Sequence, residues 1–195
     1  MTIMKVLTLP HPALKTVCDP IETVTPEIQQ LMDDLLETMY DDNGIGLSAN
    51  QVGVLKRVLV MDVPKGCWEY TGEDKNGMLI CQSSHRGDEE RESQVLMMAN
   101  PEVTEESEQK SKYQEGCLSL PGQFADVIRP AKVTVKWLGR DGKEQSREFE
   151  GLDSHCIQHE IDHLNGIVFV DHLSKLKRST LLKKLEKFKK SHNMV

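Results

Sequence analysis

The sequence lacks any run of about 18 apolar residues, the length that a membrane-crossing helix needs. Its first residues, MTIMKVLTLPHP, have no apolar stretch of signal-peptide length before Pro10 interrupts them. They are also unlike the Arg- and Ser-rich amphipathic transit peptides of organelles. We therefore expect a cytoplasmic protein with no membrane partner.

Paired cysteine spacing is also absent. The five cysteines are an odd number with no regular spacing, so we expect reduced thiols and no disulfide framework. Excess positive charge is missing too, because the formal net charge is −7. This charge argues against wholesale nucleic-acid binding, and we expect no DNA partner.

The chain has no internal repeat and no shift in composition that would mark a second domain. Its 195 residues are enough to bury a proper core, and 28% of them are charged. Strong hydrophobic residues are spread through the chain, which excludes general disorder. We predict that residues 1–195 form a single catalytic domain.

Three helices are predicted. Thr25 and Pro26 are typical of an N-cap and a first helical position, and an apolar stripe then runs at helical spacing to about Asp42. Ser154 is the expected N-cap of a second helix, which ends at Asn165-Gly166. A last helix is expected over residues 174–190. The first stripe consists of Ile28, Leu31, Met32, Leu35, Leu36 and Met39.

Strands are predicted at residues 57–63 and 95–99, which are apolar, and at 132–137, which alternates polar and apolar residues. Asp141-Gly142 is the expected bend of a hairpin between residues 132–137 and 144–149. Strands that come in hairpins favour an α+β fold with mostly antiparallel sheets. Residues 65–94 form a polar insertion, for which we favour a mobile surface loop over a small hairpin around residues 78–81.

The stretch QHEIDH contains His159, Glu160 and His163. Residues i and i+4 share a helix face, so both imidazoles can reach one ion, and Glu160 can reach a water molecule beside it. His155 lies four residues earlier, but it is about 12 Å from His163 along the helix axis, too far to share that ion. We expect His155 at a pocket wall or on the surface.

A third ligand must come from another element. Downstream, His172 is the only nearby imidazole, and Glu186 lies far along the last helix. Upstream, Cys117 follows a glycine, which lets the backbone approach a ligand closely. A buried structural thiol is the alternative interpretation of Cys117.

Three segments together resemble the peptide deformylases: GIGLSANQ (44–51), EGCLS (115–119) and QHEIDH (158–163). The resemblance covers nearly the whole chain except residues 65–94. It implies sheets packed around a central HExxH helix, and removal of the N-formyl group from the initiator methionine of nascent polypeptides. It also implies one divalent metal held by Cys117, His159 and His163. Fe²⁺ is the expected ion and Zn²⁺ or Ni²⁺ are alternatives, since these ligands do not select among them.

The same resemblance implies roles for other residues. Glu160 would move the proton from water to the departing amine, and the Gln51 amide and the Leu118 backbone N–H would stabilise the oxyanion. The extended peptide would bind as an added strand. Ser48 replaces a common alanine, which we expect to be neutral, whereas Phe124 and His155 depart from the family near the methionine pocket. The residues implied to contact the peptide are Ile45, Gly46, Glu115, Gly116, Phe124, Arg129, Leu152 and His155.

The last predicted helix is strongly basic. Residues 175–190 contain eight Lys or Arg residues and one acidic residue, Glu186. An apolar stripe of Leu181, Leu185 and Phe188 would dock this helix on the domain. The exposed charge would suit ribosomal RNA near the exit tunnel, so the ribosome is an expected partner.

Two rival functions remain from the HExxH pattern. A metalloendopeptidase would need a downstream ligand and leaves GIGLSANQ and EGCLS unexplained. A structural metal site prefers four protein ligands and has no use for Glu160 or Gln51. We expect the deformylase function.

Overall fold

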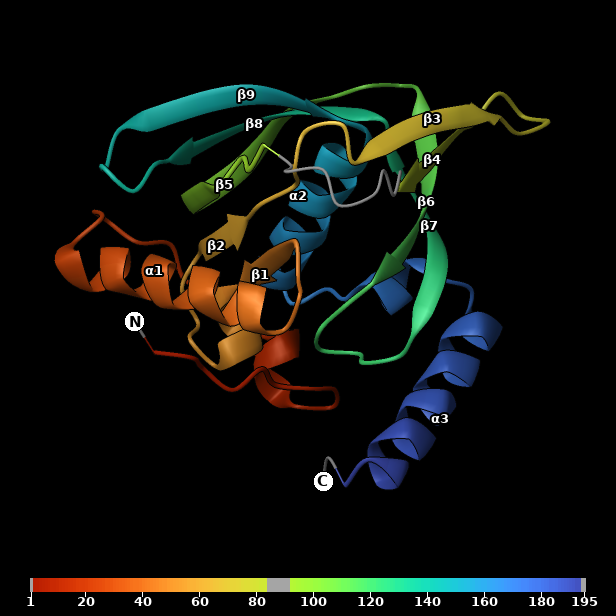
Figure 1. The fold of residues 1–195 in the computed structure, drawn as a ribbon, viewed down its shortest axis with the longest axis horizontal. Coiled ribbons are helices and arrows are strands. Elements are labelled where there is room, and N and C mark those ends of the chain that lie inside the picture. The colour runs from red at the N-terminus through yellow and green to blue at the C-terminus, as the bar shows by residue number, and fades with distance from the viewer. Residues whose placement is uncertain (1, 84–91, 194–195) are drawn as a thin grey trace.

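The computed structural model describes residues 2–83 and 92–193 and has the expected α+β architecture (Figure 1). One sheet has five antiparallel strands in the order β1-β2-β5-β8-β9. Its strands are β1 (Gly46–Ser48), β2 (Val58–Met61), β5 (Leu96–Glu106), β8 (Lys132–Leu138) and β9 (Glu144–Glu150). The predicted strands at 57–63, 95–99 and 132–137 and the hairpin at Asp141-Gly142 are all confirmed.

A second sheet has four strands in the order β3-β4-β6-β7, with only β4 and β6 parallel. They are β3 (Trp68–Glu73), β4 (Leu79–Ser83), β6 (Lys110–Gly116) and β7 (Phe124–Pro130). Strands β6 and β7 were not predicted from the sequence. Three of the side chains that these strands bury are Ser111, Glu115 and Arg129, so no apolar alternation marks them.

The central element is α2 (Gly151–Leu164), which lies between the two sheets (Figure 1). Every residue of α2 except Asp162 is buried. The helix begins at Gly151 and not after Ser154, because β9 runs directly into it through a glycine with a φ of +57°. Ser154 therefore lies inside the helix, where its hydroxyl donates to the Pro130 carbonyl. The predicted end at Asn165-Gly166 is confirmed.

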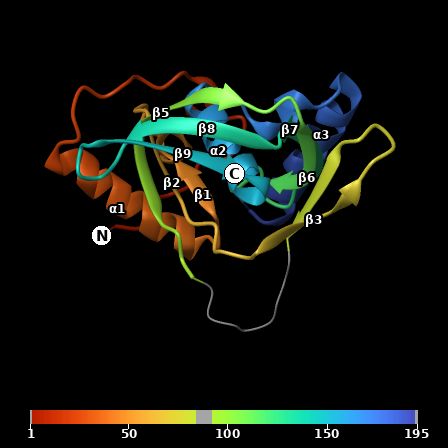
Figure 2. The ribbon, with the colours of Figure 1, turned by 90° about the horizontal axis from the view of Figure 1, so that it is seen from above.

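The other two α-helices lie at opposite sides of the molecule (Figures 1 and 2). Helix α1 (Pro26–Asp41) buries Ile28, Met32, Leu35 and Met39 against β1 and β2, as its stripe predicts. Thr25 is its N-cap residue but makes no side-chain cap hydrogen bond. Helix α3 (Lys175–Ser191) docks through Leu185, as expected, with Leu181 and Phe188 partly buried. Three short 3-10 helices are η1 (Pro12–Lys15), η2 (Ala49–Val52) and η3 (Phe169–His172).

The polar insertion contains the hairpin β3–β4, so the hairpin alternative describes residues 68–83 and the loop interpretation does not. Residues 84–91 lie outside the described part of the chain. The hairpin docks on the start of α2: a Cβ at Gly151 would lie 2.2 Å from the Trp68 ring. The Tyr70 hydroxyl also accepts a hydrogen bond from the Gly151 N–H at 3.1 Å. The insertion therefore supports the helix that carries the HExxH pattern.

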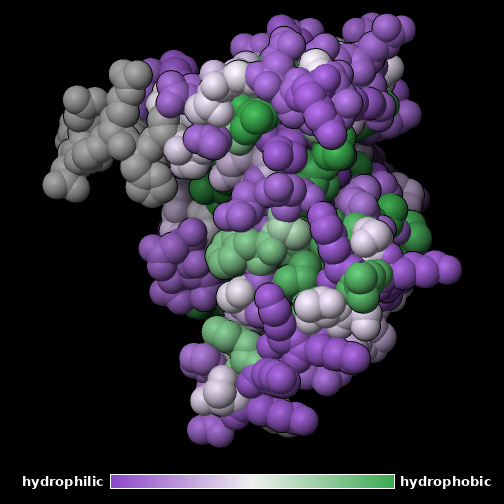
Figure 3. Space-filling view, turned by 90° about the vertical axis from the view of Figure 1, so that its right-hand side faces the viewer, coloured by the Kyte–Doolittle hydropathy of each residue, from purple (hydrophilic) through white to green (hydrophobic). Residues whose placement is uncertain are grey.

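The side of the molecule that carries β7 and α3 is covered mostly by hydrophilic side chains, with a few apolar ones between them (Figure 3). No helix in the described ranges has the length and apolar character needed to span a bilayer.

Candidate active site

Cys117, His159 and His163 converge at the centre of the molecule. Cys117 directly follows β6, and both histidines lie on α2, one helical turn apart. One potential ligand atom from each residue lies within 4.8 Å of the other two, and the Cys117 Sγ is 3.2 Å from the His163 Nε2. In tetrahedral sites with Zn–S and Zn–N bonds of the usual length, ligand atoms are about 3.3–3.6 Å apart. The three side chains thus have the spacing of a metal site with small adjustments.

The two imidazoles differ in their electrostatic surroundings. Burial lowers the pKa of His163 well below 6.5, so its ring is neutral and can offer a lone pair. Burial alone would also lower the pKa of His159, but Cys117 and Glu115 raise it well above 6.5. Cys117 and Glu115 therefore favour a positive charge at His159. A metal ion would compete with a proton for the Nε2 of this imidazole.

Glu115 holds His159 in place by a hydrogen bond to the ring nitrogen that faces away from Cys117. Its carboxylate accepts hydrogen bonds from the His159 Nδ1 at 2.9 Å and from the Arg129 Nε at 2.6 Å. Burial alone would raise the pKa of Glu115, but the Arg129 charge and the histidine hydrogen bonds hold it well below its usual range. The other nitrogen of His159 is thereby free to face the Cys117 sulfur.

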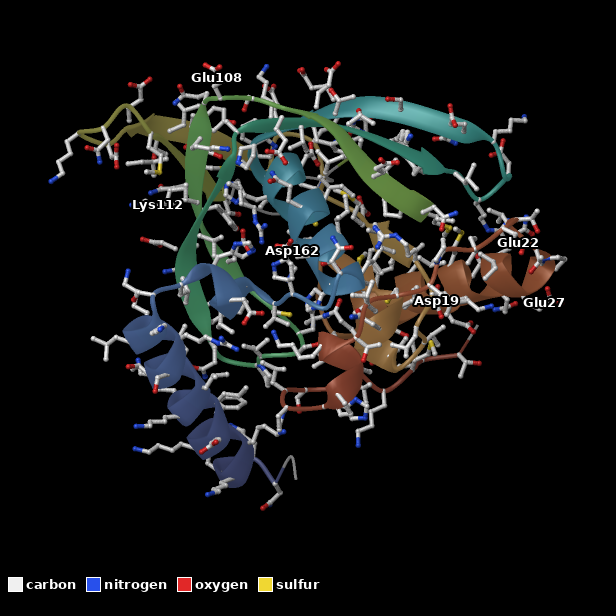
Figure 4. The ribbon with its side chains drawn as sticks, turned by 180° about the vertical axis from the view of Figure 1, so that it is seen from behind. Asp19, Glu22, Glu27, Glu108, Lys112 and Asp162 are labelled. Carbon is white, nitrogen blue, oxygen red and sulfur yellow. The ribbon has the colours of Figure 1, made fainter. Side chains whose placement is uncertain are left out.

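Arg129 also pairs with Asp162, whose Oδ2 lies 2.7 Å from the Arg129 Nη1. Figure 4 shows Asp162 on α2 near the middle of the molecule, and the same oxygen is 2.7 Å from the His172 Nε2. Arg129 is 4% exposed and does not line the cleft described below. The carboxylates of Glu115 and Asp162 occupy its guanidinium, and its predicted contact with the peptide stays a prediction. His172 is likewise engaged away from the Cys117 site.

Glu160 packs against the backbone of β1. A Cβ built on Gly46 would lie 2.6 Å from the Glu160 Oε1, so only glycine allows this approach. Glu160 is 3% exposed, and burial raises its pKa to about 7 against the opposing influence of His159. Its Oε2 and the His163 Nδ1 are the two buried side-chain polar atoms without a hydrogen-bond partner in the described part of the chain. The Glu160 Oε2 lies beside the proposed ligands, where a water molecule on a bound ion would supply a partner, whereas the His163 Nδ1 is on the other side of its ring from the Nε2 that faces Cys117.

Gln51 approaches the site from η2. Its Nε2 is 3.7 Å from the Cys117 Sγ and 3.2 Å from the Ser119 Oγ. Its Oε1 accepts hydrogen bonds from the Ser48 N–H at 2.9 Å and the Ser48 hydroxyl at 2.8 Å. The amide N–H groups therefore face the Cys117 side. Ser48 was expected to be a neutral replacement, but its hydroxyl contacts the amide whose orientation matters here.

A cleft of about 1050 Å³ opens from this centre. Gly46 of β1 lies on one side, and Gly116 of β6 and Phe124 of β7 lie on the other. His155 is buried in the wall and is not a surface residue. The predicted residues that line the cleft are Ile45, Gly46, Gln51, Glu115, Gly116, Cys117, Leu118, Phe124, Leu152, His155, His159 and Glu160.

Some residues that line the cleft were not predicted from the sequence. Cys156 lies one turn before Glu160 on the same face of α2, so helical spacing alone could have identified it. Residues Ile3 to Val6 and Thr8 also line the cleft. Backbone hydrogen bonds from Leu7 to Gln51 and from Leu9 to Ser119 hold this segment there, and no local sequence signal predicts them.

The family comparison agrees with this geometry. Residues 3–179 match the family model for polypeptide deformylase. The chain belongs to the polypeptide deformylase family. A peptide deformylase of Rhizobium meliloti is 47% identical over 191 residues, which cover 98% of this chain and 97% of that protein.

Solved structures of the family have the same fold. The peptide deformylase of Ehrlichia chaffeensis superposes with a TM-score of 0.82 at 36% identity and covers all of both chains. Its complex with actinonin gives a TM-score of 0.80 at 37% identity, covering 98% of each chain. A peptide deformylase of Legionella pneumophila gives 0.79 at 38% identity, with the same coverage.

This deformylase is therefore an enzyme that removes the formyl group from the N-terminal formylmethionine of polypeptides. The metalloendopeptidase alternative is not favoured. The family is metal-dependent, in agreement with the Cys117, His159 and His163 cluster.

Proposed function

We propose that this chain hydrolyses formylmethionyl peptides at the centre formed by Cys117, His159 and His163. The supporting observation is that these side chains converge at the buried end of a peptide-sized cleft, beside Glu160 and Gln51. Cys117 follows β6 of one sheet, Gly46 belongs to β1 of the other, and both histidines lie on α2, so elements of both sheets contribute to this centre. We propose that residues 1–195 act as one catalytic domain.

The donor set suits a divalent transition metal, because a soft sulfur and two imidazoles bind iron, nickel and zinc well. Cys117 would offer its Sγ, His159 its Nε2 and His163 its Nε2. When bound, the metal would acidify a water molecule and polarise the formyl oxygen. Fe²⁺ is the ion that we propose for the native enzyme, with Zn²⁺ or Ni²⁺ as alternatives.

Glu160 is proposed as the general base and then the general acid. Its carboxylate would take a proton from the attacking water and give it to the amine that departs. The close approach to Gly46 and the buried surroundings keep the carboxylate in one position. The side-chain N–H of Gln51 and the backbone N–H of Leu118 would donate to the oxyanion of the tetrahedral intermediate.

The peptide is proposed to bind as an extended strand along the cleft. Strand β1 is at the edge of its sheet, since β2 is its one partner among the described strands. Its free side can pair with the peptide backbone. Ile45, Gly46 and Gly116 would contact the peptide backbone, and Phe124, Leu152 and His155 would surround its side chains. The Glu115 carboxylate is occupied by Arg129 and two histidines, which leaves its backbone for such a contact.

Formate release tests this proposal. Protein loaded anaerobically with Fe²⁺ should release formate from a formyl-Met peptide, at a rate proportional to the metal content of the same sample. A chelator should abolish the release, and added metal should restore it. The same peptide without the formyl group serves as control and should stay intact. Turnover that does not depend on bound metal would contradict the proposed centre.

We further propose that the enzyme works in the cytoplasm and contacts the ribosome through α3. The lysines of this helix are mostly exposed while Leu185 anchors it, so the positive charge faces outward. Such a surface attracts the phosphates of RNA. Nascent chains leave the ribosome at a fixed place, which makes docking there useful for the enzyme.

Charge reversal on α3 tests ribosome contact. The combined changes Lys183→Glu, Lys184→Glu and Lys187→Glu alter exposed residues and should reduce co-sedimentation with ribosomes by about tenfold or more, because phosphate contacts are lost. The matched control reverses exposed lysines elsewhere: Lys56→Glu, Lys75→Glu and Lys110→Glu. Equal co-sedimentation of both triple variants would remove α3 from the proposal. Formate release from a short peptide should be unchanged in both.

A further inference from the structure

His155 makes two hydrogen bonds in the interior that the proposed mechanism does not use. Its side chain is fully buried, with its Nε2 2.9 Å from the Ser111 hydroxyl and its Nδ1 3.2 Å from the Glu115 Oε1. An ionised carboxylate can only accept, so the Nδ1 carries the hydrogen and the Nε2 accepts from Ser111. The Tyr113 ring lies against the imidazole, 5.6 Å between centroids.

The Glu115 carboxylate joins His155 to the proposed metal ligand His159. Its Oε1 accepts from His155, and its Oε2 accepts from His159 at 2.9 Å. Arg129 donates to both oxygens, at 2.6 and 3.0 Å. Each oxygen is therefore held by one guanidinium N–H and one imidazole N–H. Rotation of the carboxylate would disturb both histidines together.

Helical spacing explains why one carboxylate serves two imidazoles. His155 and His159 are four residues apart on α2 and face the last residues of β6, where Glu115 lies. His155 is thus one bond further from the proposed metal site than Glu115. The helical spacing places His155 too far along α2 to share the ion with His163. It does place His155 in hydrogen-bond contact with Glu115, the residue that holds the proposed ligand His159.

We propose that His155 is a positioning residue for His159, acting through Glu115. It fixes the carboxylate plane, which in turn fixes the tautomer and ring orientation of the ligand. Partners that hydrogen-bond directly to a metal ligand typically contribute about 10–100-fold to metal affinity. His155 acts through one more bond, so we expect a contribution of about 5–10-fold, below that range. The inference rests on the proposed function of His159 as a ligand.

Two substitutions separate the hydrogen bond from the space that His155 fills. His155→Asn keeps an N–H donor near the Nδ1 position, whereas His155→Leu has similar bulk and no donor. Co²⁺ is the probe: its dissociation constant is measured by competition with a chelator, and its absorption bands report the ligand geometry. We expect His155→Leu to weaken Co²⁺ binding by about 5–10-fold and shift the bands. His155→Asn should stay within about twofold of the wild type.

Ser111→Ala tests the same series of hydrogen bonds at the end furthest from the proposed metal site. Ser111 is buried and does not line the cleft, so its loss alters the support of His155 without altering the cleft wall. Co²⁺ affinity should fall in the same direction by about 2–3-fold, below the loss expected for His155→Leu. This variant decides the question if His155→Leu does not fold.

Wild-type Co²⁺ affinity and bands in His155→Leu, with a change in KM alone, would overturn the proposal and leave His155 as a cleft wall. Equal weakening by the Leu and Asn variants would also overturn it, because packing would then explain the effect. If the wild-type protein itself binds no Co²⁺, the ligand assignment fails instead, and that result is distinct from either outcome for His155.

Discussion

Glu160→Gln should lower kcat for formyl-Met peptides by about 10²–10⁴-fold, the usual contribution of general acid–base catalysis. In barrier height this corresponds to about 3–5 kcal/mol. Glutamine keeps the shape of glutamate, so the close packing on Gly46 is preserved. The amide cannot accept a proton from water and pass it on. KM should change little, because the side chain is expected to contact the reacting atoms and not the rest of the peptide.

Metal content and melting temperature, measured on the same Glu160→Gln sample, are the controls. Both should match the wild type, because Glu160 is outside the Cys117, His159 and His163 cluster. Activity above about one tenth of the wild type would contradict the role of Glu160 as the proton carrier. Loss of metal together with activity would instead make Glu160 part of the metal site.

Cys117→Ala should reduce bound metal to background and abolish formate release. Removing one of three proposed ligands should weaken affinity by more than the roughly 100-fold upper limit for an indirect partner. Alanine also leaves only the His159 and His163 imidazoles at the site, packed edge to face with ring centroids 5.0 Å apart. Metal analysis and a chelator competition measure the loss.

Cys81→Ala is the matched control, since Cys81 is a free thiol buried in the core and absent from the metal cluster. It should keep its metal. In thermal unfolding, metal at about 100 times its dissociation constant should stabilise the wild type and Cys81→Ala by about 2.7 kcal/mol. Cys117→Ala should show no such stabilisation. Retained metal in Cys117→Ala would show that the third ligand is elsewhere.

The sequence was sufficient for elements whose buried face is apolar. The stripe of α1, the run in β2 and the alternation in β8 all predicted their elements because burial of apolar side chains drives them. Strands β6 and β7 were not predicted, because they bury polar side chains: Ser111 hydrogen-bonds His155, and Glu115 hydrogen-bonds Arg129. Periodicity of hydrophobic residues cannot detect such a polar interior.

The residues of the candidate site also fall into those that the sequence predicts and those that it does not. His159, Glu160 and His163 are recognisable because helical spacing places them, and Cys117 because a family resemblance does. The residues that hold these side chains in place cannot be recognised from the sequence. Glu115 and Arg129 lie on neighbouring strands β6 and β7, and only the paired sheet brings their side chains to α2. Residues Ile3 to Val6 and Thr8 reach the cleft through backbone hydrogen bonds of their segment, which leave no pattern in the side chains.

Because Trp68 packs on Gly151, this enzyme has an intrinsic fluorescent probe at the start of α2. The chain has two tryptophans, and Trp137 is enclosed in the core beside Phe149, with ring centroids 6.0 Å apart. Trp68 is partly exposed, and its indole touches the first residue of α2. Indole emission is sensitive to its surroundings, so Trp137→Phe would leave Trp68 as a single fluorophore at that helix end. Any ligand that displaces the hairpin from α2 would then change the colour or intensity of the emitted light.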